Sequence, residues 1–230
     1  MSDPTPVLRL EGIVKTFPGV RALDGVSLDI LPGEVHALMG ENGAGKSTLM
    51  KVLGGIHQPD EGKIIVGEQP VVMSGPLDAK AKGIVFIHQE LSLADELSVA
   101  ENIYLGELPR KRFGLVDRAE LDARTNRILK RLKVGFNAKT RVGDLSIANQ
   151  QMVEIARALT VDAKAVIFDE PTASLTDAEK IVLFEVIADL QTQGVGIVYI
   201  SHRMEEIFKI TDRISVLRDA IPGHPQDGRD

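Results

Sequence analysis

The segment Gly40–Ser47 has the composition and spacing of a phosphate-binding loop. It fits the pattern G-x-x-x-x-G-K-[ST] and stands between an apolar run at Val35–Met39 and a helical run at Thr48–Leu53. Glycines let the backbone wrap closely around phosphates and leave N–H groups at a helix N-terminus, where anions are favoured. Lys46 is expected to reach the β and γ phosphates of ATP, and Ser47 to ligate Mg²⁺. The alternative is a glycine turn with a merely solvated lysine. The expected nucleotide contacts in this segment are Gly40, Glu41, Asn42, Gly43, Ala44, Gly45, Lys46, Ser47 and Thr48.

A pair of acids follows a second apolar run. Ala165–Phe168 is typical of a buried strand, and Asp169 and Glu170 come directly after it. Ligands of α/β folds bind at the carboxyl edge of the sheet, where these carboxylates would lie. Asp169 suits the coordination shell of Mg²⁺, and Glu170 suits a general base that activates water. Alone, such a pair is as often an ordinary turn.

The elements that would position these groups alternate between strands and helices. That alternation predicts an α/β fold with a mostly parallel sheet covered by helices. The expected buried strands are Val35–Met39, Ile84–Ile87, Ala165–Phe168 and Ile197–Ile200, and the clearest helices are Arg118–Leu132, Asn149–Thr160 and Asp177–Gln193.

Three other regions depart from this alternation. Val7–Val14 and Val26–Ile30 alternate apolar and polar residues, which predicts an N-terminal antiparallel β layer. Between about residues 92 and 160 the patterns are helical without a strand run, so we expect an inserted helical subdomain. Residues 220–230 are rich in proline and glycine and are expected to form an irregular tail.

Composition narrows the class of protein. The 230 residues carry a formal net charge of -6, which disfavours a general nucleic-acid binder. The chain has no cysteine, so disulfides and thiolate metal sites are excluded. No run approaches the roughly 18 to 20 apolar residues of a membrane span, so any membrane role is expected to be peripheral.

Five segments together resemble the nucleotide-binding domain of an ATP-binding cassette (ABC) transporter, with the domain expected over residues 1–219. The chain is most similar to the first cassette of monosaccharide importers of the ribose, xylose and galactose type. The segments are Ala37–Met50, Ile87–Ser92, Met152–Leu159, Asp169–Thr176 and Ser201–Ile207.

The resemblance implies roles for three more residues. Gln89 matches the family's glutamine, which touches Mg²⁺ or water and links the core to the helical subdomain, and His202 matches the histidine that contacts the γ-phosphate. Phe17 falls where the family stacks an aromatic ring on adenine. Each has a structural alternative, and Phe17 in particular could simply fill the β layer.

Two motifs depart from the family pattern. The signature Leu-Ser-Gly-Gly-Gln reads Leu145-Ser146-Ile147-Ala148-Asn149, which keeps Ser146 but replaces both glycines. In the family this loop contacts the γ-phosphate held by the opposite cassette, whereas Ser146 could also be a plain helix N-cap. The loop after the acids ends in Thr176, where the family usually has aspartate.

The resemblance therefore implies an ATPase that uses ATP and Mg²⁺ at the cytoplasmic face of the membrane. The implied partners are transmembrane permease subunits, a second cassette (a homodimer or a fused copy) and, indirectly, a sugar-binding protein, with no nucleic acid. Two alternatives remain open: a non-hydrolytic regulatory module and a soluble ABC ATPase. Glu170 argues against the first because degenerate sites typically lose the base.

Overall fold

The centre of the molecule is a parallel sheet of five strands. The computed structural model describes residues 4–41, 43–88 and 91–217. All neighbouring strands of this sheet run parallel, in the order β6-β7-β8-β3-β9. Their bounds are β3 Val35–Gly40, β6 Ile84–Ile87, β7 Ala165–Asp169, β8 Gly196–Ile200 and β9 Arg213–Leu217. The four predicted buried strands are confirmed to within one residue at either end.

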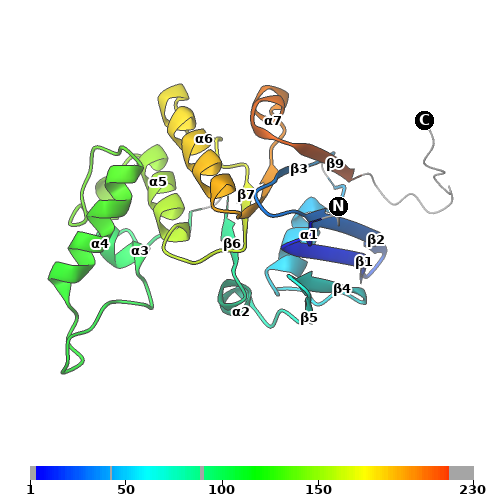
Figure 1. Ribbon diagram of the computed structural model, residues 1–230, viewed down its shortest axis with the longest axis horizontal. Coiled ribbons are helices and arrows are strands. Elements are labelled where there is room, and N and C mark those ends of the chain that lie inside the picture. Colours follow the sequence, from blue (N-terminus) through cyan, green and yellow to red (C-terminus); the bar gives the residue numbers. More distant parts are fainter. Residues whose placement is uncertain (1–3, 42, 89–90, 218–230) are drawn as a thin grey trace.

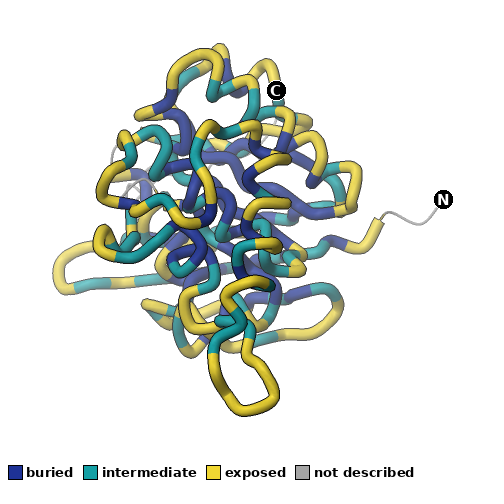
Figure 2. The backbone as a smooth tube through the Cα atoms, turned by 90° about the vertical axis from the view of Figure 1, so that its left-hand side faces the viewer, coloured by how far each residue is buried: buried dark blue, intermediate teal, exposed yellow. Residues whose placement is uncertain are grey.

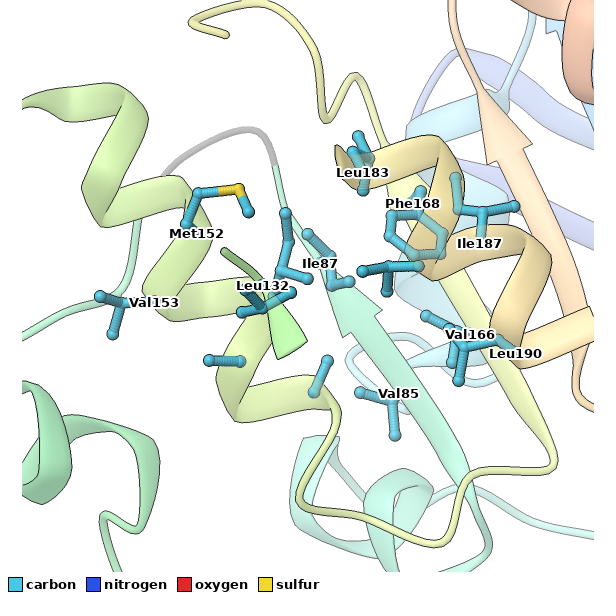
Figure 3. Close-up of a cluster of buried hydrophobic side chains, with 14 of the residues drawn as sticks. Val85, Ile87, Leu132, Met152, Val153, Val166, Phe168, Leu183, Ile187 and Leu190 are labelled. Atoms are coloured by element: carbon cyan, nitrogen blue, oxygen red, sulfur yellow. The ribbon is translucent and has the colours of Figure 1, made fainter. Parts of the chain in front are cut away.

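These runs form strands because both faces of the sheet are covered. In β7, Val166 and Phe168 pack into one hydrophobic cluster, while Ala165 and Ile167 pack into the cluster on the opposite face. Figure 3 shows the first cluster, in which Val166 and Phe168 lie between the sheet and helical side chains such as Leu183 and Ile187. Since successive side chains of a strand point to opposite faces, a strand buried on both sides must be apolar throughout.

A second, antiparallel sheet lies beside the first, in the order β2-β1-β4-β5. It consists of β1 Leu8–Phe17, β2 Val20–Ile30, β4 Glu61–Val66 and β5 Gln69–Val71. The predicted β layer is therefore present, but β1 continues to Phe17 and β2 begins already at Val20. The β4–β5 hairpin was not predicted from the sequence.

Helices cover the parallel sheet on both faces (Figure 1). Helix α1 packs between the two sheets, and α5 and α6 cover the other face. The α-helices are α1 Lys46–Leu53, α2 Pro76–Ala81, α3 Val99–Ile103, α4 Arg118–Arg131, α5 Ile147–Ala158, α6 Asp177–Thr192 and α7 Met204–Ile210. The prediction for α5 is corrected: the helix begins two residues earlier, because Ser146 is its N-cap.

Helices α3, α4 and α5 pack together beside the edge strand β6, and residues 92–160 are called the helical lobe below. The lobe has a small core of its own around Ala100, Leu121 and Ala138. Figure 2 views the molecule from the lobe side and shows buried backbone at the centre surrounded by exposed loops. None of the helices in the described ranges is long and apolar enough to cross a bilayer.

Candidate functional site

The parallel sheet brings the predicted chemical groups to one edge. The glycine loop follows β3, His88 follows β6, Asp169 ends β7, and Ser201 and His202 follow β8. Because β3, β6, β7 and β8 all run parallel, their carboxyl ends meet at the same edge. Segments far apart in the sequence thus supply one site.

The glycine loop adopts a backbone that only glycine accommodates. Gly45 has a φ of 92° and forms the N-cap of α1 without any side-chain cap. A Cβ at Gly40, whose φ is 157°, would stand 2.6 Å from the carbonyl oxygen of Leu217, and one at Gly45 would overlap the carbonyl oxygen of Ala22. The first-turn N–H groups of α1 are consequently open to an anion.

Lys46 is the cation of this loop. Its Nζ donates to the carbonyl oxygens of Gly40, at 2.5 Å, and Glu41, at 2.9 Å. The ammonium group therefore lies inside the loop, where it can exchange carbonyl partners for phosphate oxygens. Gly43, Ala44 and Thr48 belong to the same loop and first turn, whereas Asn42 lies outside the described residues.

Asp169 is a partly buried carboxyl group. Burial, followed by the charge of Glu170, raises the pKa of Asp169 above its ordinary value of 3.8, while His88 and Lys46 oppose the shift. A nearby cation would stabilise the ionised form of such a carboxyl group. Mg²⁺ is the cation that accompanies bound nucleotides.

The raised pKa gives a prediction about stability. Ionising Asp169 is harder in the folded chain, so its contribution to stability is present below pH 3.8 and lost as the pH rises through the raised folded-state pKa. Asp169→Asn should therefore raise the free energy of unfolding of the nucleotide-free chain at pH 7, and raise it less near pH 4. Urea unfolding at both pH values measures this. Glu68→Gln, at an exposed acid, is the control, and an Asp169→Asn effect that does not change with pH would contradict the prediction.

Glu170 and His202 are joined directly. His202 Nδ1 lies 2.9 Å from Glu170 Oε1, and the Glu170 side chain is only 16% exposed, against 77% for His202. Since an ionised carboxylate can only accept, the imidazole Nδ1–H donates in this pair. Nε2 and the exposed ring edge remain available to a ligand.

The backbone at Glu170 is also unusual. Its φ is 49°, in the left-handed region that non-glycine residues rarely occupy, and its N–H donates to the carbonyl oxygen of Ile200 at 2.9 Å. Strained backbone of this kind is concentrated at functional sites. Strand β8 thus fixes both the backbone of Glu170 and, through His202, its side chain.

The residues proposed for Mg²⁺ suit that ion. Ser47 is exposed in the first turn of α1, and Asp169 ends β7. Within the described ranges, no cluster of three or more His, Asp or Glu residues forms a metal cage. A hydroxyl and one carboxylate, completed by phosphate oxygens and water, is a usual environment for Mg²⁺. Gln89, the other expected ligand, lies outside the described residues.

Phe17 and Ser146 lie on separate elements from this edge cluster. Phe17 ends β1, partly exposed, and its ring meets that of His57 edge-on at 5.2 Å. Ser146 is exposed and caps α5 by accepting from the N–H of Asn149 at 3.3 Å. Ile147, which replaces a family glycine, is 65% exposed at the start of the same helix. Thr176 caps α6 in a capping box with Glu179, so threonine performs the capping that aspartate can provide.

Behind the edge lies a buried hydrogen-bond network that was not predicted from the sequence. Glu206, on α7, is 7% exposed, and its Oε2 accepts from the hydroxyls of Thr172 at 2.7 Å and Tyr199 at 3.0 Å. Burial and the Glu206 carboxylate raise the pKa of Tyr199. The network ties the segment after Glu170 to the segment that carries His202. Both segments were recognised by resemblance, but the burial of a glutamate on a short helix has no signal in sequence.

One enclosed cavity lies away from this edge. A cavity of about 240 Å³ lies near the amino ends of β7 and β8, and it is lined mainly by aliphatic side chains such as Ile155, Val166 and Leu190. The polar groups and the strained backbone lie at the opposite edge, so we place the site there.

A glycine loop that opens a helix after β3, with two acids at the carboxyl end of β7 in the same parallel sheet, defines a P-loop nucleotide-binding domain. The family model described as ABC transporter matches residues 23–173, and the chain belongs to this family. The ribose import ATP-binding protein RbsA 2 of Rubrobacter xylanophilus is 56% identical over 93% of the chain. A putative ribose/galactose/methyl galactoside import ATP-binding protein of Burkholderia cenocepacia is 53% identical, also over 93%. The chain spans 41% of the length of each relative.

Solved structures agree with the fold. The ADP conformation of MJ1267, an ATP-binding cassette of an ABC transporter, is 29% identical with a TM-score of 0.80, covering 93% of this chain and 89% of that one. The dimeric structure of MJ0796, a bacterial ABC transporter cassette, is 26% identical with a TM-score of 0.79, covering 92% and 94%. The P-loop core with its antiparallel β layer is thus confirmed.

Proposed function

We propose that this chain is the ATP-hydrolysing cassette of an importer that carries a monosaccharide through a membrane permease. The observation that carries the proposal is the arrangement at the carboxyl edge of the sheet. There, Glu170 is held by Ile200 and His202 next to Asp169. An ATP-binding module without turnover would not need a carboxylate base kept in strained backbone.

The chemistry assigns one task to each group. The amides of the glycine loop and Lys46 hold the β and γ phosphates, and His202 contacts the γ-phosphate through its exposed edge. Glu170 accepts the proton of that water. Ser47, Asp169 and Gln89 would hold Mg²⁺, which supplies charge neutralisation at the phosphates. Phe17 would stack on the adenine ring.

The partners are inferred from relatives and from exposed groups. The relatives are named as import ATP-binding proteins for ribose and galactose, which supports a sugar permease and a sugar-binding protein as partners at the cytoplasmic membrane face. The dimeric MJ0796 structure supports pairing with a second cassette. Ser146 is exposed at the N-terminus of α5, where it is free to meet a phosphate held by that cassette. Ile147, with its exposed side chain, would limit how closely the two approach.

A cassette exchange tests this function. The present chain replaces the matching cassette of a ribose import ATP-binding protein, in cells that keep the permease and the binding protein. Uptake of labelled ribose, galactose and xylose is then measured. We expect uptake of at least one sugar and none with Lys46→Ala in the exchanged cassette.

The Ser146→Arg variant, measured in the same cells, tests whether Ser146 acts at the contact between two cassettes. It should reduce uptake while leaving the ATP affinity of the isolated chain unchanged. No uptake of any of the sugars, despite normal expression and ATP binding, would reject the importer assignment. Normal uptake by Ser146→Arg would reject only the role of Ser146.

A further inference from the structure

The segment that joins α3 to α4 ends in a hairpin with an unusual surface. Residues 110–116, here called the lobe hairpin, read Arg-Lys-Arg-Phe-Gly-Leu-Val. Phe113 is 89% exposed and Leu115 70% exposed. They belong to the segment between α3 and α4, which projects below the lobe in Figure 1. In Figure 2 this lowest loop is coloured as exposed. Exposed apolar side chains are common on protein surfaces, but here two of them stand beside three cations in one short loop.

The hairpin is a formed structure with a fixed base. Lys111 donates its N–H to the carbonyl oxygen of Leu115 at 2.7 Å, and Gly114 donates its own to Lys111 at 2.9 Å. Arg110 and Val116 form an isolated antiparallel β-bridge. The guanidinium of Arg110 also donates to the carbonyl oxygen of Gly114 at 2.9 Å. Val116 packs against the small core of the lobe. The base is therefore anchored by backbone and guanidinium contacts, in which the side chains of Phe113 and Leu115 take no part.

The charges of the hairpin are uncompensated. Among the described residues, no carboxylate lies within ion-pair distance of Arg110, Lys111 or Arg112. Five of the other nine cations of the lobe form ion pairs with described residues, for example Arg131 with Asp189 and Lys133 with Glu185. The lobe carries twelve Lys and Arg against nine Asp and Glu, although the whole chain has a net charge of -6. The lobe hairpin is thus an exposed, positively charged surface on a chain whose net charge is negative.

We propose that the lobe hairpin binds an anionic phospholipid bilayer. Phe113 and Leu115 would enter the boundary between headgroups and acyl chains, and Lys111 and Arg112 would bind the phosphates. An anionic surface would repel the acidic remainder of the chain and attract the lobe, so charge also sets the orientation. This contact does not depend on ATP hydrolysis or on the identity of the sugar, so its failure would leave the proposed function intact.

Vesicle co-sedimentation tests the proposal. The full chain is mixed with vesicles of phosphatidylcholine alone, or with a third of the lipid as phosphatidylglycerol. We expect binding only to the anionic vesicles, and loss of that binding at high salt. Removing both cations in Lys111→Gln/Arg112→Gln should weaken the partition coefficient roughly 30-fold, because each cation near such a surface contributes about 5-fold. Phe113→Ser should weaken it by about 10-fold.

Two matched variants distinguish the hairpin from general effects. Arg131→Gln/Lys133→Gln removes the same net charge from paired positions, and Phe208→Ser removes an aromatic that is 71% exposed on α7. Neither should change vesicle binding. If both double variants weakened binding equally, net charge alone would be responsible and the proposal would be wrong.

The chain contains no tryptophan, so Phe113→Trp provides a single tryptophan in the hairpin, which can be excited selectively at wavelengths where tyrosine absorbs little. Its emission should shift to the blue on anionic vesicles and be quenched by brominated lipid. An emission that stays solvent-like would overturn the proposal even if the protein sediments. A second pair of results would also overturn the proposal: the wild-type chain does not bind lipid, and hairpin variants no longer form a complex with the permease in detergent. The hairpin would then bind an acidic protein partner.

Discussion

Glu170→Gln is expected to lower the rate of ATP hydrolysis by a factor of about 100 to 10,000 and to leave ATP affinity nearly unchanged. The amide still accepts the hydrogen bond from His202 Nδ1 that Glu170 Oε1 accepts at 2.9 Å, so the local geometry should persist. What is lost is the ability to take the proton of the attacking water. Phosphate release by the paired assembly, measured beside equilibrium ATP binding, separates the two effects.

Glu205→Gln is the matched control for this variant, because Glu205 is an exposed acid three residues after His202, in the first turn of α7. It should hydrolyse ATP at the wild-type rate. Near-normal turnover by Glu170→Gln would remove Glu170 from the role of base. Absence of phosphate release by the wild-type assembly would instead favour the non-hydrolytic alternative.

The sequence predicts the parallel core well because burial on both faces forces a simple pattern. Ile84–Ile87 and Ala165–Phe168 are uninterrupted apolar runs, and both form strands. The β4–β5 hairpin has no such pattern, since β4 opens with three exposed residues and β5 contains Pro70. Its existence depends on pairing with β1, a contact between residues about fifty positions apart.

The candidate site could likewise be predicted from the sequence only in part. Motif spacing places Lys46, Asp169 and Glu170 at one edge because that edge is a property of strand direction, which the alternation of strands and helices predicts. The positive φ of Glu170 and its hydrogen bond to His202 depend on how two loops settle against β8, and no residue spacing encodes that. The buried Glu206 network could not be predicted for a similar reason, because a glutamate on a short helix is usually exposed.

Lys46→Ala is expected to weaken ATP binding by roughly one to two orders of magnitude, because a charged hydrogen bond to phosphate is lost. Lys46 Nζ donates to the carbonyl oxygens of Gly40 and Glu41 in its own loop. The loop backbone is shaped by its glycines, so it does not need these two contacts. The variant should therefore keep its melting temperature while calorimetric titration with ATP shows the weaker affinity.

Lys51→Ala is the matched control for this second variant. Lys51 is exposed in the last turn of the same helix, α1, where it faces the opposite end of the helix dipole from the phosphate site. It should bind ATP as the wild type does. Equal affinity in Lys46→Ala and Lys51→Ala would mean that the loop amides alone hold the phosphates, and the assignment of Lys46 would be wrong. A drop in affinity accompanied by a lower melting temperature in Lys46→Ala alone would point to a structural role, since the loop would then depend on the two carbonyl contacts.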